Sequence, residues 1–248
     1  MSERYSKLFA LTGNLYTGGS PVMIAAGALL KDNLSGQILA QLKLCNINIK
    51  TIKAATVLVA PLDTAGKPLG EPIIHQYLDL HTGRDEDFGQ KVPIVLPNPV
   101  TRSFAVSVTE VIFSDNSIWN DANAAWKPLR SPRPLDAMGD LAKQFRTEYG
   151  SGCKNLLLEQ QDLWYCVCCA LNRREETCCH KCHRILSNLK AIDLDDLLER
   201  KKKRFAQEQM EAEQAISKYG KSREIAAIIF VIVMALIIIS ALVASMPH

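Results

Sequence analysis

The chain has 248 residues, enough for one full domain with smaller modules beside it. Hydrophobic residues make up 48% of the chain and charged residues 22%, which excludes a protein that is disordered throughout. The 29 basic and 26 acidic residues leave a net charge of +3, too small a field to point to nucleic acid as the main partner.

Residues 1–120 contain short apolar runs separated by turn signals. Residues 37–44, QILAQLKL, alternate apolar and polar side chains with the period of a half-buried strand. Residues 51–63 are apolar on both faces toward their end, which indicates a central strand. A hairpin is predicted at Asp115-Asn116. Further strands are predicted within residues 22–30, 71–80, 91–97 and 102–119. Seven or eight strands at this spacing favour an all-β sandwich.

The run LKLCNINIKTIKAATVLVAPLDTAGKPL, residues 42–69, resembles the immunoglobulin-like and fibronectin-like interaction domains of bacterial envelope proteins. The shared features are an asparagine after one strand, an isoleucine-centred next strand and an Asp…Gly turn. The resemblance covers about a hundred residues and implies an immunoglobulin-like interaction domain over 1–120. An unrelated sandwich or a barrel has the same pattern and remains the alternative.

Residues 121–163 predict a linker followed by a short amphipathic helix. The first part is rich in proline, WKPLRSPRPL. Apolar side chains then recur at helical spacing, which predicts a helix that packs on a neighbouring domain. These side chains are Leu135, Met138, Leu141, Ala142 and Phe145.

Residues 164–182, WYCVCCALNRREETCCHKC, hold six of the eight cysteines. In a reducing cytosol clustered cysteines are more often metal ligands than disulfides, and zinc takes four ligands from two tight turns. Cys179 and Cys182 make one pair. In the other pair, Cys166 is joined by either Cys168 or Cys169.

The same stretch resembles the Ran-binding-protein type of zinc finger and related bacterial zinc-ribbon membrane proteins of unknown function. Their pattern is Trp-x-Cys, a variable gap, Cys, three residues, Asn, six residues and Cys-x-x-Cys. Five positions agree in register when Cys168 is the second ligand. These are Trp164, Cys166, Asn172, Cys179 and Cys182.

The resemblance implies a zinc ribbon over 164–186, with Zn²⁺ held by Cys166, Cys168, Cys179 and Cys182, and with Cys169 as the alternative to Cys168. It also implies that Trp164 packs beside the metal and that the Asn172 side chain bonds between the two turns. Cys169 stands where bacterial ribbons often carry glycine, so a strained positive φ is expected there.

A closed set of thiolates indicates a structural zinc ion, since a catalytic zinc keeps one coordination position open. No phosphate-binding glycine loop, nucleophile elbow or zinc-protease helix occurs in the chain, so an enzyme is not expected. Replacement of a cysteine ligand by His180 or His183 is an alternative. Cys169 and Cys178 are then spare thiols.

Residues 187–222 predict a juxtamembrane helix, with acidic residues at its start and basic residues after them. Residues 225–244, IAAIIFVIVMALIIISALVA, have Ser240 as their one polar side chain. A helix of this length rises roughly 30 Å, the thickness of a hydrocarbon core, which predicts a single transmembrane helix. Basic residues flank it on the N-terminal side, so the positive-inside rule places the rest of the chain in the cytoplasm, as in a tail-anchored protein.

Together these features predict a non-enzymatic, membrane-anchored cytoplasmic scaffold or adaptor that binds a protein partner. One alternative is nucleic-acid binding through the ribbon, which is not favoured because acidic residues interrupt the basic patch. That patch consists of Arg173, Arg174, Lys181 and Arg184. The other alternative is a redox switch in which oxidation of Cys168, Cys169 or Cys178 ejects zinc.

Overall fold

The computed structural model describes residues 4–121 and 125–244. Within the last helix it describes side chains up to residue 219, together with Ile232. The chain divides into two compact units. The first unit combines Met1–Pro134 with Lys154–Lys190, and the second combines Leu135–Cys153 with Ala191–His248.

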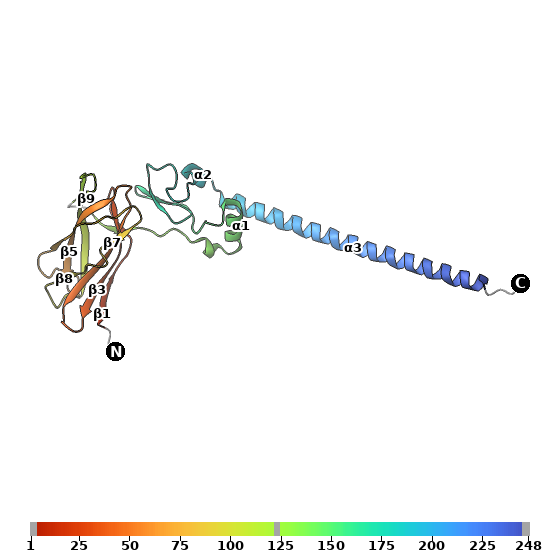
Figure 1. The fold of residues 1–248 in the computed structure, drawn as a ribbon, viewed down its shortest axis with the longest axis horizontal. Helices are drawn as coiled ribbons and strands as arrows, with labels where there is room; N and C mark the ends of the chain where they lie inside the picture. Colours follow the sequence, from red (N-terminus) through yellow and green to blue (C-terminus); the bar gives the residue numbers. More distant parts are fainter. Residues whose placement is uncertain (1–3, 122–124, 245–248) are drawn as a thin grey trace. The chain divides into compact units, whose positions relative to one another are not determined.

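The first unit contains two antiparallel sheets that form a sandwich (Figure 1). One sheet has the order β11-β2-β3-β4-β7, with β1 also paired to β3 and β8 to β4. Its strands are β1 (Tyr5–Leu11), β2 (Leu15–Tyr16), β3 (Val22–Asp32), β4 (Ile38–Asn46), β7 (Asp87–Phe88), β8 (Ile94–Leu96) and β11 (Lys127–Pro128). The other sheet has the order β10-β9-β5-β6. Its strands are β5 (Ile52–Leu62), β6 (Ile73–Tyr77), β9 (Ser103–Phe113) and β10 (Ile118–Asn120).

Alternating side chains build the shared core of the two sheets. In β9, Phe104, Val106 and Val108 are buried, while the residues between them face outward or are half-buried. Strand β5 lies between β9 and β6, in agreement with the central strand predicted for residues 51–63. The predicted hairpin joins β9 to β10, with Asn116 at φ 61°. A β-rich N-terminal region is therefore confirmed.

The cysteine-rich segment forms a third small sheet that belongs to the same unit as the sandwich. Its order is β12-β13-β14, with β12 (Leu158–Gln160), β13 (Leu163–Tyr165) and β14 (Leu171–Arg173), and a short helix follows, α2 (Leu186–Lys190). We call residues 154–190 the ribbon. Residues 154–163 thus belong to the ribbon, although the sequence places them in a linker. A three-residue strand is too short to show a period of two.

The second unit is helical. It contains the 3-10 turn η1 (Leu135–Met138), helix α1 (Asp140–Tyr149) and helix α3 (Leu194–Ala244). Helix α1 occupies the place predicted for the amphipathic helix and buries Ala142 and Phe145. A carboxylate of α1 pairs with α3, Glu148 to Arg200 at 2.9 Å.

Helix α3 continues without a break from the predicted juxtamembrane region through residues 225–244. Over the part of the chain whose side chains the structure describes, no helix is both long enough and apolar enough to cross a bilayer. Apart from Ile232, the side chains of the predicted span lie outside the described residues.

Candidate metal centre

Four sulfur atoms converge in the ribbon. The Sγ atoms of Cys166, Cys168, Cys179 and Cys182 all lie within 4.8 Å of one another. Sγ of Cys166 is 3.4 Å from that of Cys182, and Sγ of Cys168 is 3.6 Å from that of Cys179. A tetrahedral zinc ion with bonds of about 2.3 Å would separate its sulfur ligands by about 3.8 Å. The spacing and the donor type therefore fit a single zinc ion.

Each of the two turns that carry these thiols is closed by a backbone hydrogen bond and followed by a left-handed residue. In the first turn, the amide of Cys169 donates to the carbonyl of Cys166 at 2.9 Å. In the second turn, the amide of His183 donates to the carbonyl of Cys179 at 2.9 Å. The residue after the second thiol of each pair has a positive φ, 77° at Cys169 and 59° at His183. Cys168 therefore occupies in the first turn the position that Cys182 occupies in the second turn.

Cys169 lies outside the group of four thiols. Its side chain is exposed and accepts a hydrogen bond from Nδ2 of Asn155 at 2.9 Å. Its φ of 77° is the left-handed conformation expected at a position where related ribbons carry glycine. Cys178 is likewise exposed and outside the group. The structure thus brings together the set of thiols that includes Cys168, and it leaves Cys169 and Cys178 at the surface.

The positive φ of Cys169 leads to a prediction. Glycine adopts this conformation without the Cβ clash, so we expect Cys169→Gly to raise the free energy of unfolding by about 0.5–1 kcal/mol and to leave the metal bound. The measurement is thermal unfolding of the full chain with metal analysis on the same sample. Cys178→Gly is the control, since Cys178 has no positive φ. A fall in stability for Cys169→Gly would contradict the interpretation.

Trp164 and Asn172 support the two turns. Trp164 is 1% exposed and pairs across the sheet with Asn172, and its Nε1 donates to the carbonyl of Arg173 at 2.8 Å. The Asn172 side chain donates to the carbonyl of Ala170 in the first turn at 3.1 Å. Its oxygen accepts from the amide of His180 in the second turn at 3.1 Å. The asparagine therefore bridges the two turns, as the resemblance implies.

Neither histidine belongs to the group of four thiols. The ring of His180 places Nδ1 2.7 Å from Oδ1 of Asn172 and Nε2 2.7 Å from Oδ2 of Asp85. His183 occupies the left-handed position after Cys182. Among the described residues, the four thiols are the one group of His, Cys, Asp and Glu side chains that is arranged to hold a metal.

The environment of the thiols changes how readily each one ionises. Burial raises the pKa of Cys166, and it raises the pKa of Cys168 to about 11. Burial also opposes ionisation of Cys182, but hydrogen bonds from Arg184 and from the Cys166 thiol lower the pKa of Cys182 to about 6. Without a metal, Cys166 and Cys168 therefore keep their protons at neutral pH, whereas Cys182 is ionised. A bound divalent ion would displace those protons and neutralise the thiolates.

The ribbon docks on the sandwich through an apolar cluster. Leu163 and Leu171 of the ribbon pack with Tyr16, Ile47 and Leu129 of the sandwich. All five are buried, with exposed fractions of 7% or less. Burial of this kind stabilises the ribbon independently of any metal that the thiols bind.

Two ion pairs flank this cluster. Asp162, in the turn between β12 and β13, accepts hydrogen bonds from Tyr16 at 2.7 Å and from the amide of Gly19 at 2.9 Å. Arg173 pairs with the same carboxylate at 3.3 Å. Burial raises the pKa of the Tyr16 hydroxyl, and the hydrogen bond to Asp162 raises it further. The hydroxyl therefore stays a proton donor. Arg84 of the sandwich makes a bidentate pair with Glu176 of the ribbon, at 2.6 and 2.8 Å.

The sequence did not identify these docking residues. Arg84 and Asp85 lie in a loop of the sandwich, about ninety positions from their ribbon partners, and no local pattern marks them. The docking also uses Arg173, one of the four bases of the predicted nucleic-acid patch. Its side chain is 16% exposed and bonds to Asp162 and to the carbonyl of Ser20.

The candidate metal centre is therefore a group of four thiols in a ribbon docked on a β-sandwich. Comparison with family models, with curated proteins and with solved structures gives no match for this chain.

Proposed function

We propose that the chain is a non-catalytic scaffold protein. One structural zinc ion, held by Cys166, Cys168, Cys179 and Cys182, keeps the ribbon folded, and the β-sandwich presents a binding surface to a protein partner. The observation that carries the proposal is the grouping of the four Sγ atoms within 4.8 Å. Four thiolates fill the coordination sphere of zinc, which leaves no position for a substrate or for a water nucleophile.

The contacts around the thiols support a structural role for the metal. Asn172 links the two thiol-bearing turns, and His180 of the second turn contacts Asp85 of the sandwich at 2.7 Å. Ordering the second turn therefore also orders a contact with the sandwich. A small ribbon buries too little apolar surface to fold by itself, so the metal would supply much of its folding free energy.

Cobalt substitution tests the closed site. We expect one Co²⁺ per chain, with the intense visible spectrum of a tetrahedral thiolate complex. Adding azide or cyanide should leave that spectrum unchanged, because no coordination position is open. A spectrum that changes with either anion would contradict a purely structural metal. Absence of any stoichiometric metal would contradict the site itself.

We further propose that residues 225–244 anchor the scaffold in a membrane, with the N-terminal side in the cytoplasm. The support is the apolar composition of these twenty residues and the basic flank before them, which includes Lys218, Lys221 and Arg223. The ribbon and sandwich would then be tethered to the bilayer through α3.

Vesicle flotation tests the anchor. The full chain, synthesised in the presence of phosphatidylcholine vesicles, should float with them and resist alkaline extraction. Met234→Asp combined with Ile238→Asp should abolish flotation, since each aspartate near the centre of a span costs about 2.5–3.5 kcal/mol of insertion free energy.

The matched control places two aspartates at the same spacing in the polar part of α3, Ala206→Asp with Met210→Asp. Both residues are exposed, so the control should float like the unmodified chain. Recovery of the unmodified chain in the vesicle-free fraction would contradict the anchor.

The geometry does not favour nucleic-acid binding through the ribbon. Arg173 is engaged with Asp162 and Tyr16, and the Glu176 carboxylate of the ribbon pairs with Arg84. This engagement takes one of the four bases of the predicted patch away from a phosphate backbone.

A further inference from the structure

Strand β6 lies at an edge of its sheet. Among the described residues it pairs with β5 alone, at the end of the order β10-β9-β5-β6. A pocket of about 500 Å³ opens between the end of β6 and residues 87–92, so the C-terminal half of this edge is open to solvent. An edge strand presents backbone N–H and C=O groups that can pair with a further strand.

The hydrogen bonds at the end of β5 show which of its residues face β6. The carbonyl of Leu62 accepts from the amide of Arg102, beside β9, at 2.9 Å. The carbonyl of Pro61 accepts from the amide of Leu69, on the other side of β5, at 2.9 Å. Backbone groups alternate between the two sides of a strand, so the odd-numbered residues 57 and 59 of β5 bond toward β6.

The even-numbered residues of β6 therefore point their backbone groups away from β5. The pairing of the two strands has no irregularity and places Val57 opposite His75, so odd-numbered residues of β6 bond to odd-numbered residues of β5. The N–H and C=O groups of Ile74 and Gln76 are then directed to the open edge. The next residue in this series is Leu78.

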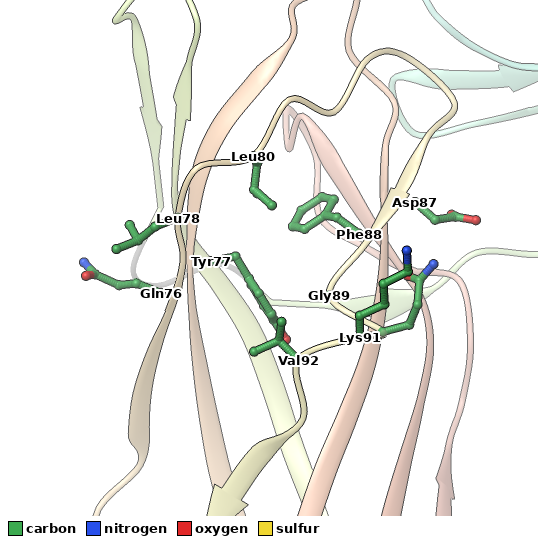
Figure 2. A pocket seen from close by; sticks show the side chains of 10 residues that line it. Gln76, Tyr77, Leu78, Leu80, Asp87, Phe88, Gly89, Lys91 and Val92 are labelled. Atoms are coloured by element: carbon green, nitrogen blue, oxygen red, sulfur yellow. The ribbon is translucent and has the colours of Figure 1, made fainter.

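The same three residues form an uncharged strip on the outer face of the sheet. Ile74 is 70% exposed and Leu78 is 61% exposed, with the exposed Gln76 between them. Figure 2 shows Gln76 and Leu78 on the side of β6 opposite Tyr77. No Asp, Glu, Lys or Arg occurs from Pro72 to Leu78, although edge strands that remain single are usually protected by charged side chains. This edge is therefore suited to pairing.

A second copy of β6 complements this strip. When two copies run antiparallel with Gln76 opposite Gln76, Ile74 of each copy lies opposite Leu78 of the other. The two apolar pairs are identical, as two-fold symmetry requires, and opposite side chains on one face contact each other. Only even-numbered residues face one another across the edge, so the outward backbone groups also match.

The neighbouring register centred on His75 fits less well. It places Pro72, which has no N–H group, opposite Leu78. It also places Glu71 opposite Asp79, so two like charges meet at each end of the strand pair. The register centred on Gln76 brings no like charges opposite each other.

The register centred on Tyr77 is also disfavoured. It places Ile74 opposite Leu80, whose amide already donates to the carbonyl of Lys53 at 2.9 Å. The outward groups of Ile74 would then lack a partner at both ends of the pair. The sequence of the edge thus selects the register centred on Gln76.

We propose that β6 is a homodimerisation edge, at which two copies of the chain pair antiparallel through residues 74–78. The two four-stranded sheets then join into one continuous sheet. A second copy is the partner because the edge complements itself in side chains, backbone direction and charge. This pairing goes beyond the scaffold role and does not require zinc, since β6 lies in the sandwich and not in the ribbon.

Self-association of the full zinc-bound chain in dodecyl maltoside micelles tests the pairing. A short strand pair buries less surface than a standard interface, so we expect a dimer with a Kd on the order of 100 µM, measured by sedimentation equilibrium. Hydrogen exchange locates the contact. The amides of Ile74 and Gln76 should exchange about fourfold more slowly at ~1 mM than at ~10 µM protein, by mass action.

Two double variants test the register. Ile74→Lys with Leu78→Lys places like charges opposite each other across the dimer, so the Kd should rise about tenfold or more. Ile74→Lys with Leu78→Glu places opposite charges there, so its Kd should stay within about threefold of the unmodified chain. Within one chain the two positions lie roughly 13 Å apart along the strand, so the contrast reports on pairing between copies.

Ile118→Lys with Val95→Lys is the control for added charge. These residues are 58% and 53% exposed and lie outside β6, so this variant should associate like the unmodified chain. Three results would overturn the proposal. They are a monomer at every concentration up to about 1 mM, as expected if the edge binds a peptide of another protein, equal Kd values for the two variants of Ile74 and Leu78, and no slowing of exchange at Ile74 and Gln76.

Discussion

Replacing Cys179 with serine should release the metal and unfold the ribbon, whereas replacing its neighbour Cys178 should do neither. Cys179 is fully buried and its sulfur belongs to the group of four, while Cys178 is exposed and outside it. Loss of a contact that merely supports a zinc ligand typically weakens metal binding 10–100-fold. Loss of the ligand itself should exceed this range, so we expect an affinity decrease of at least about 100-fold for Cys179→Ser.

A second pair of serine variants decides whether Cys168 or Cys169 is the second ligand of the first turn. Cys168→Ser should release the metal as Cys179→Ser does, and Cys169→Ser should retain one ion per chain. Zinc analysis after dialysis against a competing chelator measures both pairs of variants. Release of metal by Cys169→Ser, with retention by Cys168→Ser, would show that Cys169 is the ligand and Cys168 is not.

Replacing Asp162 with alanine should destabilise the first unit by about 3 kcal/mol. The carboxylate accepts hydrogen bonds from Tyr16, Gly19 and Arg173, and a hydrogen bond to a charged group contributes about 1.5–3 kcal/mol. Removing it also leaves the Arg173 guanidinium, whose side chain is 16% exposed, without its counter-charge. Chemical unfolding of the full zinc-bound chain measures the effect.

Glu159→Ala is the matched control for Asp162→Ala. Glu159 lies three residues away in β12 and pairs with Lys190 at 2.7 Å, but both side chains are more than 40% exposed. An exposed ion pair contributes about 0–1 kcal/mol, so this variant should be nearly neutral. Equal effects of the two substitutions would show that Asp162 does not hold the ribbon against the sandwich.

Much of the local architecture follows from short-range patterns in the sequence. Strand alternation and turn residues predicted the β-rich region, the central strand β5 and the β9–β10 hairpin. The resemblance to a zinc-finger family implied that Trp164 packs beside the two turns, that Asn172 bonds between them, and that Cys169 takes a glycine-like positive φ. Such features are legible because the interacting groups lie within a few residues of one another.

The docking of the ribbon was decided only by the tertiary structure. Tyr16 and Asp162 are 146 positions apart, and Arg84 and Glu176 are 92 positions apart. A single charged residue in a loop has no periodicity and no motif, so its partner is defined only when the sheets bring the loops together.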